Sequence, residues 1–149
     1  MAKEKKPVKK HSQSELDHAF QTAVIHGLIS EALLILKAGA NIDAQPKDPM
    51  LPNSPSQTAL QMIIDSRHDG HFKANMIKFL LDNGADPNVD SGDGSLPLLS
   101  TVSRIIVIDG GILKAQHTRN QDLLDYLNDS HEQHLSIVHN LILNGADLD

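Results

Sequence analysis

The residues with the clearest capacity for chemistry are the histidines, of which the chain has nine. His131 and His134 are three residues apart, so a helix would place them on one face, and His68 and His71 have the same spacing. A zinc site needs three or four ligands in tetrahedral geometry. His139 falls off the face of the first pair, and the chain has no cysteine. We therefore interpret these histidines as helix-surface residues and predict no metal site.

Residues 86–93 resemble the start of a calcium-binding loop, because aspartate, asparagine and serine alternate there. The pattern fails at two positions that such a loop requires. Gly92 is the seventh residue where the sixth should be glycine, and Pro97 stands in twelfth place, where a bidentate glutamate is needed. Asx and glycine residues also make turns, and we predict a turn here.

Catalytic motifs are missing from the sequence. It contains no phosphate-binding Gly-rich loop with lysine and no Gly-x-Ser-x-Gly element. Asp65 and His68 are three residues apart, a spacing typical of a surface pair on a helix. Nothing fixes a nucleophile beside a base and an orienting group. We predict that the protein is not an enzyme, with no catalytic residues and no cofactor.

Charge divides the chain into a basic N-terminus and an acidic body. Residues 1–10 hold five lysines and one glutamate, a net charge of +4, whereas residues 11–149 hold eight basic and eighteen acidic side chains, a net charge of −10. We predict a disordered basic tail over residues 1–13. Because the acidic body would repel phosphate groups, we expect no nucleic-acid partner. No apolar run approaches the roughly 18 residues of a membrane span, and we expect a cytoplasmic protein without a secretory leader.

An internal repeat organises the rest of the sequence. The segments 38–43, 83–88 and 144–149 share a Gly-Ala-Asx core, and each follows a run of aliphatic residues. Glycine can adopt the left-handed conformation that ends a helix. The pattern therefore predicts three helices that end at glycines 39, 84 and 145. Since only 3% of the residues are aromatic, aliphatic side chains must fill the core, which suits closely packed helices.

These segments resemble the ankyrin repeat. Residues 27–43 match its second helix and following loop without a gap, residues 58–64 resemble its first-helix start, and residues 84–99 follow the register of its hairpin. The chain departs from the family in spacing, because its glycines are 45 and 61 residues apart instead of about 33. The resemblance implies an all-α solenoid of about three helix pairs joined by short hairpin loops, in a domain at 14–149 with repeats at about 14–43, 44–88 and 89–149.

Helix signals divide the repeats further. Apolar spacing predicts a first helix capped by Ser14, a second at 29–38, and a pair at 58–67 and 73–83. Four prolines predict an extended loop over residues 44–57. In the third repeat we expect a helix from Pro97, a separate short helix at 121–127 and a last helix near 131–144. Residues 104–112 are compatible with a hairpin around 109–111 or with an overrun of the preceding helix, and we favour the overrun.

The resemblance also implies a function, which is the binding of a partner protein through a concave surface of hairpin tips and first helices. The tips are acidic, so we expect a partner with a basic patch. An alternative is that the chain is the N-terminal targeting domain of a larger enzyme, such as a host-directed bacterial effector. The candidate partner-binding residues are Asp43, Lys47, Asp48, Met50, Leu51, Gln61, Asp65, Asp90, Asp93 and Ser103.

The last helix is apolar over more than one stripe, at residues 135, 137, 138 and 141–143. An exposed Leu or Ile forfeits roughly 1.5–3 kcal/mol of burial. We therefore expect this end of the stack to be covered. Further repeats rank first as the cover, the 104–128 segment second and a second copy of the chain third.

Overall fold

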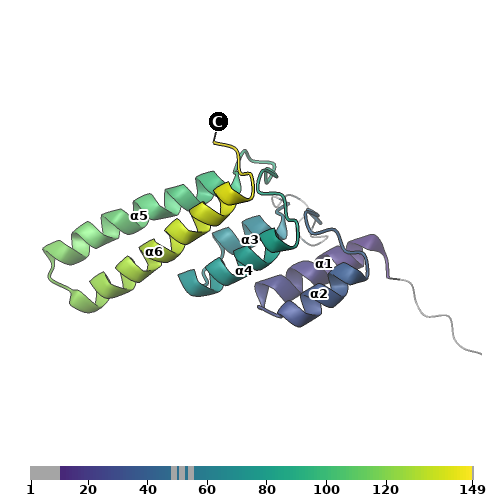
Figure 1. Cartoon of the computed structure of the whole chain (residues 1–149), viewed down its shortest axis with the longest axis horizontal. Helices are drawn as coiled ribbons and strands as arrows, with labels where there is room; N and C mark the ends of the chain where they lie inside the picture. The colour runs from purple at the N-terminus through teal and green to yellow at the C-terminus, as the bar shows by residue number, and fades with distance from the viewer. Residues whose placement is uncertain (1–10, 48–49, 51–52, 54–55, 149) are drawn as a thin grey trace, which may run out of the picture.

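The computed structural model describes residues 11–47, 50, 53 and 56–148 (Figure 1). These residues contain helices and no strand, so the predicted all-α class is confirmed. The helices are α1 (Gln13–Ile25), α2 (Ile29–Lys37), α3 (Ala59–Asp65), α4 (Gly70–Asp82), α5 (Pro97–His117) and α6 (Gln121–Leu143).

The six helices form three antiparallel pairs that stack in chain order (Figure 1). Within the pairs α1 packs against α2, α3 against α4 and α5 against α6. Between the pairs α1 contacts α3, α3 contacts α5, and α4 lies along α6. This is the helix-pair solenoid that the repeat pattern predicts.

Aliphatic side chains fill the core, as the composition requires. Its largest fully buried members come from every pair, and they include Phe20, Leu60, Ile77, Ile137 and Leu141. The core is continuous from α1 to α6. Each pair is therefore stabilised mainly by burying one face against the next pair.

The three predicted helix stops are present. Gly39, Gly84 and Gly145 have positive φ angles of 107°, 92° and 90°. In the second repeat the Gly84 N–H donates to the Leu81 carbonyl, and the next N–H donates to the carbonyl of Leu80. These bonds satisfy carbonyls that have no partner within the helix.

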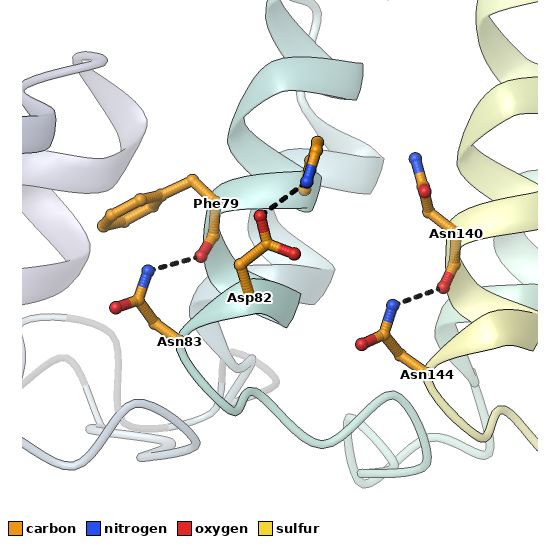
Figure 2. A network of polar contacts seen from close by, with 6 residues as sticks. Phe79, Asp82, Asn83, Asn140 and Asn144 are labelled. Carbon is orange, nitrogen blue, oxygen red and sulfur yellow. Dashed lines mark hydrogen bonds and ion pairs between the residues drawn. The ribbon is translucent and has the colours of Figure 1, made fainter.

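An asparagine side chain adds a hydrogen bond at two of these helix ends. The Asn83 side chain donates to the Phe79 carbonyl, and the Asn144 side chain donates to the Asn140 carbonyl, both at 2.8 Å (Figure 2).

A second recurring bond joins neighbouring repeats. Asp43 Oδ1 accepts the backbone N–H of Asp86 at 2.9 Å, and one repeat later Asn88 Oδ1 accepts that of Asp147 at 2.7 Å.

The first helix begins earlier than the sequence suggested. Its cap is Ser12 and not Ser14, because Ser12 and Glu15 form a reciprocal capping box. Asp17, the acid three residues after Ser14, is buried, and its Oδ1 accepts the backbone N–H of Asn41 at 2.8 Å. The helix therefore begins inside the segment assigned to the tail, of which residues 1–10 lie outside the described residues.

The fourth helix also begins earlier, at Gly70 and not at residue 73. Asp69 is its cap and accepts the backbone N–H of Phe72 at 3.0 Å. Gly70 is needed for close approach to α6, since a Cβ there would lie 2.7 Å from the Cβ of Gln133. The third helix begins one residue later than predicted, after its cap Thr58, and ends two residues earlier, at Asp65.

The long insertion of the third repeat is helical throughout. Residues 104–112 continue α5, so the overrun is correct and the hairpin is absent. The prediction of two separate helices at 121–127 and 131–144 is wrong, because α6 runs through both. Gly111 lets the helices approach closely, as a Cβ there would lie 3.1 Å from Leu127 Cδ1. Figure 1 shows α5 and α6 extending well beyond α3 and α4.

The expectation that the 104–128 segment covers the outer face of the last helix pair is wrong. Leu135 and Ile142 of α6 remain exposed, and so do Val102, Ile106 and Leu113 of α5. The reason is that the inserted residues lengthen both helices along their axes instead of folding across them.

Candidate functional site

A shallow groove lies on the surface that α3 and α5 share, below the tip that joins the second and third repeats. It has a volume of about 570 Å³. Its lining residues are Asp65, Gly94, Ser95, Leu99, Ser100, Ser103, Arg104 and Val107. We call it the α3/α5 groove. Two candidate residues from the sequence, Asp65 and Ser103, therefore lie in one depression.

The tip over residues 89–95 is held by its own acidic side chains. Asp90 Oδ1 accepts the backbone N–H groups of Gly92 at 2.7 Å and Gly94 at 3.0 Å. Asp93 Oδ1 accepts that of Ser95 at 2.9 Å, and this bond lowers the pKa of the Asp93 carboxyl. Both side chains are exposed, so the tip presents negative charge at one end of the groove.

The tip of the first repeat is less open. Asp43 is half-buried, and its Oδ1 accepts the backbone N–H of Asp86 in the second repeat. Burial raises the pKa of its carboxyl. Lys47 is exposed, and Met50 is 87% exposed. Asp48 and Leu51 lie outside the described residues. Among these candidates, Lys47 and Met50 therefore remain accessible.

Gln61 is not on the surface, contrary to the expectation. It is fully buried between α3 and α5, where its Nε2 donates to Asp65 Oδ2 at 2.9 Å and to Ser100 Oγ at 3.0 Å. Gln57 donates to the same Asp65 oxygen at 2.8 Å. The candidate Gln61 thus acts as a polar link below the groove and orients the carboxylate of Asp65.

The sequence patterns did not predict a cluster of basic side chains at the end of α3, formed by the buried Lys73 and His134 and the exposed groove residue Arg104. Lys73 of α4 is buried, and its Nζ donates to the Ile64 carbonyl at 2.9 Å, while Arg104 donates to the Asp65 carbonyl at 3.2 Å. These carbonyls end α3, where a helix carries partial negative charge. Burial lowers the pKa of Lys73 to about 8, and the nearby charge of Arg104 acts in the same direction.

His134 belongs to the same cluster from the α6 side. It is buried, and its ring contacts the Ser130 carbonyl at 2.7 Å. Burial lowers its pKa, and the positive charges of Lys73 and Arg104 add to this effect, while the bond to Ser130 opposes it. The signal that could have revealed Lys73 is its spacing of four from Ile77, which places it on the buried face of α4.

Of the other histidines with metal-like spacing, His68 contacts the Ile25 carbonyl at 3.0 Å, and His71 and His131 pair with carboxylates. His71 contacts Asp129 at 3.0 Å, and His131 contacts Asp109 at 3.1 Å. In the described part of the chain no three histidine or acidic side chains gather into a set that could hold a metal ion. These ion pairs join α4 to α6 and α6 to α5, so they link the long α5/α6 pair internally and to the second repeat.

Among the described residues, none of the helices combines the length and the apolar character that a bilayer span requires.

Comparison with known proteins agrees with this architecture. A model of the ankyrin repeat matches residues 56–91, which contain α3, α4 and the start of the acidic tip. Neither the curated proteins nor the solved structures gave a match. Ankyrin repeats are generally protein–protein interaction modules, and the family is typically non-enzymatic. The second helix pair is therefore similar to an ankyrin repeat, and it stands within a stack of three helix pairs.

Proposed function

We propose that this protein binds a partner protein through the hairpin tips and the first helices of its repeats. The observation that carries the proposal is that the matched repeat ends in an exposed acidic tip directly beside the α3/α5 groove. Carboxylates at the rim and exposed apolar side chains in the groove give the two kinds of contact that protein interfaces combine. The cytoplasmic location expected from the sequence is part of this proposal.

The partner should carry a basic patch, because Asp90 and Asp93 are exposed at the rim and their carboxylates accept hydrogen bonds from backbone N–H groups. Charges at a rim mainly steer association and are screened by salt. Replacing both with lysine should slow association about tenfold and change dissociation much less. Capture of a partner from lysate, followed by binding kinetics at low and high salt, measures this.

A matched control reverses two exposed acids elsewhere, Asp122 and Asp125 at the start of α6. It makes the same change in net charge at a distance from the tip, and we expect association close to that of the wild type. Equal capture by the tip variant, or affinity that does not change with salt, would reject the electrostatic basis of the proposal.

A further inference from the structure

One face of α5 continues the groove far beyond α3. Leu99, Ser103 and Val107 follow one another at intervals of four, so they lie on one face of the helix, and all three line the groove. Leu99 is 58% exposed and Val107 is 72% exposed. This face therefore presents two large apolar side chains to solvent where α3 ends.

The same face extends into the part of α5 that the insertion adds. Gly110 and Lys114 follow Val107 after three and seven residues, which keeps them on this side of the helix. A Cβ added at Gly110 would meet no atom within 4 Å. Glycine in a helix interior is less favourable than alanine, and no packing among the described residues explains Gly110, so the position leaves room for a group from outside.

Opposite charges stand at the two ends of this face. Asp90 and Asp93 lie in the tip that precedes α5, whereas Lys114 and Arg119 are exposed near its other end. Along the helix axis, Lys114 lies about 22 Å from Leu99. Two of the acids of α6 do not face this basic end. Asp125 and Asp129 each stand two residues from Leu127, which packs on α5, and this spacing turns them away from α5.

We propose that the face of α5 that carries Leu99, Val107 and Lys114 binds an amphipathic helix of about four turns that lies antiparallel to α5. This inference rests on the proposed function. The basic C-terminal end of the bound helix meets Asp90 and Asp93, its apolar stripe covers Leu99 and Val107, and its acidic N-terminal end meets Lys114. Where the ligand helix passes Gly110, it approaches the backbone of α5 closely.

Helical form and direction both follow from the chemistry of the face. The backbone groups of α5 are engaged within the helix, so a bound segment must satisfy its own backbone, as a helix does. An acidic N-terminus and a basic C-terminus also favour the dipole of the ligand helix. With those ends, charge complementarity to the tip and to Lys114 is met only in the antiparallel orientation.

The test uses a displayed library of 18-residue peptides on a helical frame. Leucine is fixed at central positions four residues apart, and lysine, glutamate or serine varies at both ends. Selection with the full chain should enrich peptides with acidic N-terminal and basic C-terminal ends. Binding of the enriched peptides should weaken at least tenfold with Gly110→Leu and with Lys114→Glu, as measured by fluorescence anisotropy.

Two features make the result decisive. Gly110→Leu should raise the melting temperature or leave it unchanged, since Leu is the better helix former, so lost binding cannot be blamed on unfolding. Lys37→Glu, the same charge change on the exposed face of α2, should bind like the wild type. Enrichment without preference at the ends, no enrichment, or binding unaffected by Gly110→Leu overturns this inference. If peptides insensitive to Gly110→Leu still need Asp90 and Asp93, the proposed function survives and only the α5 site is wrong.

Discussion

Replacing Leu141 with alanine should lower the free energy of unfolding by about 2–5 kcal/mol. Leu141 is fully buried and belongs to the core that joins α6 to the rest of the stack. Truncating it removes apolar contacts and leaves a cavity. Because folded proteins are stable by only about 5–15 kcal/mol, this is a large fraction of the total. Urea unfolding followed by circular dichroism measures it.

Leu143, two residues further on, is the matched control. It is 69% exposed, and Leu143→Ala should change the free energy of unfolding by less than about 0.5 kcal/mol. Similar effects of the two substitutions would mean that α6 is rotated relative to the structure described here.

The second large effect concerns Lys73 and pH. Because its pKa is near 8 in the folded state and 10.5 ordinarily, the unfolded chain binds more protons between these values. Stability should therefore rise as pH increases from about 8 to 10.5, by on the order of 3 kcal/mol from this residue. Below pH 8 both states are protonated and the contribution becomes constant. Unfolding in urea at several pH values, for the wild type and Lys73→Met, isolates the effect as their difference.

Lys78→Met serves as the control, because Lys78 lies on the same helix with its side chain exposed. It should keep the pH dependence of the wild type. If Lys73→Met also keeps that pH dependence, then Lys73 is solvated in the folded protein, and its burial at the end of α3 is contradicted.

Local signals predicted most of the helix pairs. Gly84 and its two counterparts end helices because glycine alone takes positive φ without strain, a property readable from one residue type. The predicted break between two helices at residues 128–130 is wrong because contacts with another helix, and not local signals, determine this segment. Asn, Asp and Ser are weak helix formers, yet they stay helical where Asp129 contacts His71 of α4 and Ser130 lies beside Gly70 of α4. Tertiary contacts decided that segment, and spacing could not reveal them.

The candidate site shows the same division. The acidity of the tip at Asp90 and Asp93 follows directly from composition, and both residues are exposed as expected. Gln61 was misplaced because its burial depends on where α5 lies, which no pattern in α3 records. The polar character of glutamine predicted a surface position, but Asp65 and Ser100 accept hydrogen bonds from its Nε2 inside the protein.

The most direct test of protein binding by the tips and first helices is hydrogen exchange of the chain, free and bound to its captured partner. The account predicts added protection in the tip at 89–95 and in α3 and α5. Such protection follows when a partner covers amides and suppresses local opening. Protection confined to α2, α4 and α6, with the tip and α5 unchanged, would contradict it.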